Sequence, residues 1–226
     1  EKLHKVDMVI VDKTGTITIG KPTLVDIQNL SNLKDDELVS ILASLEKKSE
    51  HPIAHAIVSY AQEKNIPVSD ALNFEGIQGK GLKGLIGHTE YFVGNAKLVS
   101  DLKIPFDTAK LNEFTSQGKT PVILATKEKV LGFVMVADEI KSESKQAVAD
   151  LHKLGIKVVM LTGDDEKAAK YMASLVGIDD VVAHVLPQDK LAKMKELPSQ
   201  GRIVAMAGDG VNDAPALAQA DAGLAM

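Results

Sequence analysis

Three short runs of almost continuous apolar residues end in turns rich in glycine or aspartate. They lie at residues 6–11, 156–161 and 203–207. Runs of this length and composition are typical of strands that are buried on both faces of a sheet. Helical patterns lie around them, at about 142–154, 165–176, 188–196 and 213–220. Because strand and helix alternate, the pattern predicts an α/β fold with a doubly wound parallel sheet.

A different pattern occupies the middle of the chain. Apolar positions recur at helical spacing over residues 33–45, and a second helix is predicted to begin at Pro52, since proline is favoured at the first helical position. After Pro67, short alternating segments rich in glycine indicate an antiparallel sheet. We therefore predict an inserted α+β domain, made of a helical hairpin and an antiparallel sheet. The predicted ranges are 25–131 for the insert, and 1–24 with 132–226 for the parallel-sheet domain.

Composition narrows the possible functions. The chain has 226 residues, of which 45% are hydrophobic and 25% charged, and its net charge of -5 gives no basic field for nucleic acid. The absence of cysteine excludes disulfides, thiolate zinc sites and cysteine nucleophiles. No apolar run approaches the roughly 20 residues of a membrane span. Since residues 221–226 stop inside an apolar run, we expect the parallel-sheet domain to be truncated there.

Polar residues that could take part in catalysis lie where the predicted parallel strands end. Asp12, Thr162 and Asp209 each follow or close one of these strands, and such loops converge at one edge of an open α/β sheet. Two carboxylates this close need a cation, and a purely oxygen ligand set beside a phosphate favours Mg²⁺. Lys13 and Lys190 add positive charge. We therefore predict a phosphate site that contains a metal ion.

The segment Asp12-Lys-Thr-Gly-Thr16 suggests what this site does. An aspartate can attack a phosphoryl group and form an acyl phosphate. A second aspartate two positions later would hasten hydrolysis as a general acid and base, but Thr14 is a poor proton carrier. The phosphorylated form should therefore persist. Taken singly, an aspartate such as Asp12 after a strand is more often a turn or cap residue, and the segment 162–164 is at least as readily a helix entry. Their joint occurrence with the long string at 208–215 favours a functional site.

The insert has weaker motifs. The segment 49–52 opens the second predicted helix, where His51 and Glu50 can hydrogen-bond a purine or phosphate. From this segment alone, an ordinary helix cap is the favoured interpretation. The string 79–84 fits G-x-G-x-x-G, but an alternating segment follows it instead of a helix, which excludes a dinucleotide fingerprint. Residues 118–120 resemble the end of a P-loop without its leading glycine. His51 and His55 lack the glutamate of a zincin motif.

Three motifs resemble the phosphorylation domain of P-type ATPases, within the haloacid-dehalogenase-like superfamily. They are DKTGT at 12–16, TGD at 162–164 and GDGVNDAP at 208–215. The resemblance implies that Asp12 is the phosphorylated nucleophile and that ATP and Mg²⁺ are required. The metal ligands that it implies are Asp12, the carbonyl of Thr14, and Asp209. The other implied catalytic residues are Thr162, Gly163 and Asp164 of the TGD motif, with Lys190, Asn212 and Asp213.

The insert resembles the nucleotide-binding domain of heavy-metal-transporting P-type ATPases. The resemblance rests on Ser-Glu-His-Pro at 49–52, the glycine loop at 79–84, and Gly94-Asn95. The SEHPIA form of the first motif favours the copper branch, and zinc or cadmium transport remains the alternative. The residues implied around the adenosine part of ATP are Glu50, His51, Gly79, Gly81, Gly94 and Asn95.

By this resemblance the chain is the ATP-binding and phosphorylation unit of a metal pump, a cytoplasmic domain of an integral membrane protein. Transfer of the γ-phosphate to Asp12 would drive ion transport, and no nucleic-acid partner is expected. The implied partners are the membrane and actuator domains of the same polypeptide, and the transported ion would bind there. Two other functions stay open: a free-standing phosphatase or phosphotransferase, and a regulatory nucleotide-binding module.

Overall fold

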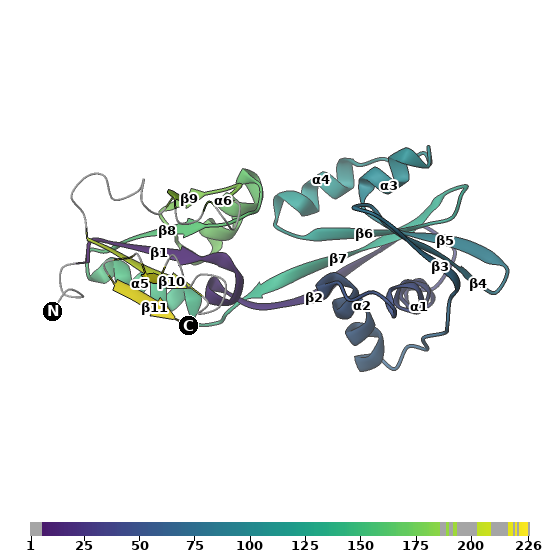
Figure 1. Cartoon of the computed structure of the whole chain (residues 1–226), viewed down its shortest axis with the longest axis horizontal. Helices are drawn as coiled ribbons and strands as arrows, with labels where there is room; N and C mark the ends of the chain where they lie inside the picture. The colour runs from purple at the N-terminus through teal and green to yellow at the C-terminus, as the bar shows by residue number, and fades with distance from the viewer. Residues whose placement is uncertain are drawn as a thin grey trace. The chain divides into compact units, whose positions relative to one another are not determined.

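The computed structural model describes residues 6–185, 189, 192–193, 203–208, 217–218, 220 and 222–225. The chain forms two compact units. Unit 1 comprises Glu1–Lys21, Ser116–Gly118 and Asp138–Met226, and unit 2 comprises Pro22–Thr115 and Lys119–Ala137. Two strands, β2 (Thr18–Asn29) and β7 (Val130–Ile140), continue from one unit into the other (Figure 1).

Unit 1 contains a parallel sheet, as the apolar runs predict. Its strands are β1 (Met8–Asp12), β8 (Lys157–Leu161), β9 (Asp180–Val182), β10 (Val204–Gly208) and β11 (Ala222–Ala225). They lie in the order β11-β10-β1-β8-β9, and every pair is parallel. Every residue of β1 and β10 is buried. Because a strand buried on both faces excludes most polar side chains, these segments are nearly continuous apolar runs.

Both faces of the parallel sheet are packed. Val9 and Val11 of β1 lie in one apolar cluster with Ala169 of α6 (Glu166–Val176) and Val148 of α5 (Ser144–Lys153), whereas Ile10 lies in another. This alternation follows from the two-residue period of a strand. The predicted helices at 142–154 and 165–176 are confirmed as α5 and α6. Those at 188–196 and 213–220 lie largely outside the described residues.

Unit 2 is built on a sheet in the order β2-β7-β6-β5-β4-β3. The pairs from β3 to β7 are antiparallel, as the alternating segments predict. The remaining strands are β3 (Leu72–Ile77), β4 (Gly81–Ile86), β5 (Thr89–Gly94) and β6 (Thr120–Ala125). The predicted hairpin is formed by α1 (Asp35–Glu46) and α2 (Pro52–Glu63). It covers one face of the sheet, and α3 (Ala96–Asp101) and α4 (Ala109–Ser116) cover the other (Figure 1).

The core of unit 2 has one layer on each face of its sheet. Leu124 and Val134 belong to the cluster under α1 and α2, whereas their neighbours Ile123 and Phe133 belong to the cluster under α3 and α4. Our sequence analysis did not predict α3 or α4. Both are short, and α4 buries a single residue, Leu111, so neither leaves a clear helical pattern of apolar positions.

Candidate phosphorylation site and nucleotide pocket

Asp12 is the last residue of β1, the middle strand of the parallel sheet. Its partner in β8 is Leu161, and Val11 pairs with Ala207 in β10. The three strands therefore end at the same level, and Thr162 directly follows β8 at this edge. Asp12 is 5% exposed and Thr162 is 2% exposed. The structure thus brings these two polar side chains to one edge of the sheet in a largely buried setting.

The polar side chains of residues 162–165 make different contacts. Asp165 caps α6, since its side chain accepts from the backbone N–H of Lys167 at 2.9 Å and of Ala168 at 3.1 Å. Asp164 is therefore not the cap, and its carboxylate pairs with the Lys13 ammonium at 2.8 Å. The Thr162 hydroxyl accepts from the Asp164 N–H at 3.2 Å, which leaves its own proton available for an acceptor at the site.

A wide turn, Lys13–Ile17, follows the nucleophile candidate. Thr14 is extended, whereas Gly15 has φ of 77°, a left-handed conformation that glycine adopts without steric cost. Thr16 is buried, and its hydroxyl has no hydrogen-bond partner among the described residues. A buried hydroxyl that follows Asp12 by four residues and has no described partner is a candidate donor to a bound polar ligand.

Four predicted residues lie outside the described part of the chain: Lys190, Asp209, Asn212 and Asp213. Their proposed roles rest on the sequence. The described residues alone contain no group of three or more His, Asp or Glu side chains able to hold a metal. The donors that they do offer near Asp12, a carboxylate and backbone carbonyls, are oxygens, which is the donor type that Mg²⁺ prefers.

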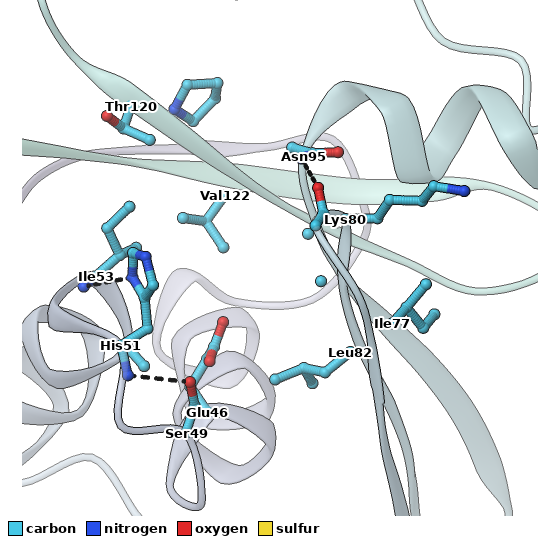
Figure 2. A pocket seen from close by; sticks show the side chains of 15 residues that line it. Glu46, Ser49, His51, Ile53, Ile77, Lys80, Leu82, Asn95, Thr120 and Val122 are labelled. Atoms are coloured by element: carbon cyan, nitrogen blue, oxygen red, sulfur yellow. Dashed lines mark hydrogen bonds between the residues drawn. The ribbon is translucent and has the colours of Figure 1, made fainter. Parts of the chain in front are cut away.

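Unit 2 contains a cavity of about 420 Å³ between the α1–α2 hairpin and the sheet (Figure 2). This volume lies in the usual range for small-molecule sites. Five of the six residues predicted around adenosine line it: His51, Gly79, Gly81, Gly94 and Asn95. Glu50 is exposed and is not among the lining residues. The other lining residues are Glu46, Ser49, Ile53, Ala54, Ile77, Lys80, Leu82, Thr120, Pro121 and Val122.

Two glycines form one wall of this cavity by close backbone approach. Gly81 and Gly94 are direct partners across β4 and β5. A Cβ atom on Gly81 would lie 2.0 Å from the Val93 carbonyl oxygen, and one on Gly94 would lie 2.1 Å from that of Lys80. No side chain fits at either position without displacing backbone. The glycines are therefore required by the shape of the wall, whatever ligand it faces.

His51 and Asn95 both cap helices as well as lining the cavity. The His51 Nδ1 accepts from the Ile53 N–H at 3.2 Å, so its Nε2 is the nitrogen left for a ligand. The Asn95 side chain accepts from the Leu98 N–H at 3.1 Å and donates to the Gly79 carbonyl at 3.1 Å. The helix-cap interpretation of the 49–52 segment is thus confirmed, and it coexists with a position in the cavity.

Glu46 is the residue that our sequence analysis missed. It is the last residue of α1, is 8% exposed, and turns its carboxyl group into the cavity toward the strands (Figure 2). Burial raises the pKa of this carboxyl group from 4.5 to about 7, against the lowering effect of a hydrogen bond from Ser49. A signal was present: Glu46 continues the four-residue spacing of Leu38 and Leu42 on the buried face of α1.

Comparisons with known proteins find P-type ATPases among the proteins of similar sequence. A copper-exporting P-type ATPase of Staphylococcus saprophyticus is 46% identical over the whole chain, and a copper-transporting P-type ATPase of Rhizobium leguminosarum is 47% identical. The chain spans only 28% and 27% of their lengths. No helix among the described residues has the length and apolar character of a membrane span.

Solved structures match both units. A zinc-transporting PIB-type ATPase in its E2.Pi state superposes with a TM-score of 0.84 at 34% identity, over 97% of this chain and 36% of that one. The catalytic domain of the CPx-ATPase CopB-B gives a TM-score of 0.74 at 29% identity, over 97% of this chain and 79% of that one. Residues 6–221 match the haloacid dehalogenase-like hydrolase family. The chain therefore belongs to the haloacid dehalogenase-like hydrolases, and it matches the catalytic part of heavy-metal P-type ATPases.

Proposed function

We propose that this chain is the ATP-binding and phosphorylation unit of a heavy-metal pump, with Asp12 as the residue that takes up the γ-phosphate. One observation carries the proposal: a buried aspartate ends the middle strand of the parallel sheet, at the edge where the strands on either side also end. This is where open α/β sheets place their reactive groups. The family and the names of its relatives support the same chemistry.

In the proposed reaction, the Asp12 carboxylate attacks the γ-phosphorus of ATP. A bond forms between its oxygen and phosphorus, the bond to the bridging oxygen breaks, and ADP leaves with that electron pair. The Thr162 hydroxyl donates to the transferring phosphoryl group, and Lys13 adds positive charge while Asp164 orients it. Thr14 supplies no carboxylate to activate water, so the acyl phosphate persists.

Mg²⁺, when bound, would neutralise developing charge on the phosphoryl oxygens. The proposed ligands are Asp12, the Thr14 carbonyl and Asp209. Among these, the two described residues offer the oxygen donors that the ion requires. Lys190 and Asn212 are proposed to contact the phosphoryl group, as the motif resemblance implies. Asp213 is proposed to support Lys190 and the metal site.

The cavity of unit 2 is the proposed ATP site. Its lining residues include no Phe, Tyr or Trp, so the base would be held between aliphatic side chains and the glycine wall instead of by ring stacking. Glu46 and the Nε2 of His51 are the polar groups placed to recognise the adenine edge. We assign this role to Glu46 ahead of Glu50, because only Glu46 lines the cavity.

Copper is the proposed transported ion, because the curated relatives at 46% and 47% identity carry copper names. Zinc is the second candidate, since a zinc-transporting enzyme is a structural match. The chain spans about 28% of its relatives' length, so the membrane and actuator parts of the polypeptide would be its partners. The groups that select the ion would lie in those parts.

The proposal is tested by acid-stable labelling of the intact polypeptide with ATP that carries a radioactive γ-phosphate. Wild type should take up label, and Asp12→Asn should take up none. Asp7→Asn is the matched control, because Asp7 is an exposed aspartate just before β1 and its variant should label as wild type does. Label retained by Asp12→Asn would contradict the assignment. Rapid turnover of small phosphate esters without any label would indicate a phosphatase.

A further inference from the structure

The segment after β7 holds the turn Lys13–Ile17 through its backbone carbonyl groups. The Lys141 ammonium donates to the Gly15 carbonyl at 2.7 Å. The Lys141 backbone N–H donates to the Ile17 carbonyl at 3.0 Å, and the Ser144 hydroxyl donates to the same carbonyl at 2.8 Å. All these residues belong to unit 1. Two residues more than 120 positions away in sequence therefore brace the loop that begins at Asp12.

The contact made by Lys141 fixes the most flexible point of this loop. Gly15 has φ of 77°, and glycine restricts the backbone less than any other residue. A charged donor makes a stronger hydrogen bond to a carbonyl than a neutral donor does. Since β1 fixes Asp12 at one end, the Lys141 bond restrains the peptide after Gly15 at the other. The Thr14 carbonyl lies between these two fixed points.

Phosphoryl transfer depends on such restraint. There is little covalent assistance for the protein to provide, so the rate depends on holding the nucleophile and its surrounding charges in place. A displacement of about 1 Å is enough to cost about a hundredfold in rate. Without the Lys141 ammonium, the Lys13 and Ile17 carbonyls would keep their donors. The peptide after the left-handed Gly15 would lose its charged donor, and the Thr14 carbonyl could then move relative to Asp12.

We propose that Lys141 is a positioning residue for phosphoryl transfer, which acts by holding the Gly15 carbonyl and, through it, the loop that follows Asp12. The inference rests on the proposed function of Asp12. Lys141 contacts backbone and no reacting atom, so it is not a catalytic residue.

Four variants separate position from charge. Lys141→Met removes both the donor and the charge, Lys141→Gln keeps a neutral donor, and Lys141→Arg keeps both. Lys145→Met is the matched control, because Lys145 is an exposed lysine four positions further on, in the first turn of α5. Lys141→Gln also provides a milder variant if Lys141→Met lowers the yield of folded protein.

Two measurements on the intact polypeptide test the inference. The first is the rate of labelling from ATP, for which Lys141→Met should be about tenfold slower or more at saturating ATP, with its KM for ATP within about twofold of wild type. Lys141→Arg should recover most of the rate, and Lys145→Met should match wild type. Wild-type rates for Lys141→Met, or a higher KM at an unchanged rate, would overturn the inference.

The second measurement does not depend on activity. Hydrogen exchange of the backbone amides of residues 13–17, without nucleotide, should become several times faster in Lys141→Met at an unchanged melting temperature. Unchanged exchange in this segment would overturn the role of Lys141. If wild type takes up no label, the proposed function fails, whereas the exchange result still decides whether Lys141 holds the loop.

Discussion

The two units build their candidate sites in different ways. In unit 1, side chains provide the chemistry, and they sit where parallel strands end, at Asp12 and Thr162. In unit 2, backbone provides the shape, because Gly81 and Gly94 let two antiparallel strands approach closely beside the cavity. The difference shows that a reactive site is specified by a few residues in loops, whereas a binding cavity is specified by cross-strand pairing that no single segment reveals.

Carboxyl groups also differ between the two units. Asp12 of unit 1 is the last residue of β1 and directly precedes Lys13, whose ammonium group pairs with the Asp164 carboxylate. Glu46 of unit 2 lies among aliphatic side chains of the cavity, and burial raises the pKa of its carboxyl group to about 7. A group that titrates near neutrality is suited to recognition in which it both donates and accepts hydrogen bonds.

The largest effect is expected from a side chain added to the glycine wall. In Gly94→Ala, the new Cβ would lie 2.1 Å from the Lys80 carbonyl oxygen, so β4 and β5 must separate. We expect a loss of about 3 kcal/mol in the free energy of unfolding, measured with urea. Binding of a non-hydrolysable ATP analogue, measured by calorimetry, should weaken at least tenfold.

The control for this prediction is Gly76→Ala. Gly76 lies in β3, and a Cβ added there would meet no atom within 4 Å beyond its chain neighbours. This variant should therefore change the free energy of unfolding by less than about 1 kcal/mol. Equal effects of the two substitutions would show that the close approach of Gly81 and Gly94 does not shape the cavity.

Glu46 should make the stability of the protein depend on pH. Its pKa rises from 4.5 to about 7 on folding, so the folded state binds more protons than the unfolded state between these values. The stability that the raised pKa of Glu46 contributes to the folded state is fully present below about pH 4.5. It is lost as the pH rises to about 7 and the carboxyl group loses its proton. At pH 8, Glu46→Gln should therefore be more stable than wild type by about 2 kcal/mol.

Thermal and urea unfolding at pH 4.5, 6 and 8 check this prediction. The stability difference between Glu46→Gln and wild type should grow with pH and reach its full value above about pH 7. Glu50→Gln is the matched control, since Glu50 is exposed and four positions away, and this variant should be about as stable as wild type at pH 8. Parallel curves for wild type and Glu46→Gln would contradict the assignment.

The smallest effect is expected from an ion pair beside the cavity. The Lys80 ammonium pairs with the Asp101 carboxylate at 2.6 Å, and both side chains are partly exposed. Exposed pairs contribute little because water screens them. We expect Asp101→Asn to leave the free energy of unfolding, measured by urea titration, almost unchanged. A loss comparable to that of Gly94→Ala would show that charge, more than backbone shape, maintains the cavity.

The sequence predicts unit 1 well where its elements are strongly patterned. Apolar runs between turns identify β1, β8 and β10, and the parallel order follows from the helices α5 and α6 between strands. The position of Asp12 beside Thr162 follows from the same pattern. The predicted roles of Lys190, Asp209, Asn212 and Asp213 lie outside the described residues and stay predictions.

Unit 2 is less predictable because its site depends on pairing between distant segments. The glycine motifs identify the strand ends, but only the register places Gly81 opposite Gly94. The Ser-Glu-His-Pro motif led us to predict Glu50 as a ligand-binding residue. The 3.6-residue period of α1 instead places Glu46 on the buried face of that helix. The short helices α3 and α4 are held by packing under the sheet more than by their own sequence patterns.

The assignment of phosphorylation to unit 1 and of ATP binding to unit 2 is tested most directly by labelling from two phosphate donors. Acetyl phosphate needs no adenine site, whereas ATP does. In His51→Asn, which keeps a helix cap and removes the imidazole, label from ATP should fall at least tenfold while label from acetyl phosphate stays at the wild-type level. Asp12→Asn should accept label from neither donor. Equal losses with both donors in His51→Asn, or label on Asp12→Asn, would contradict the account.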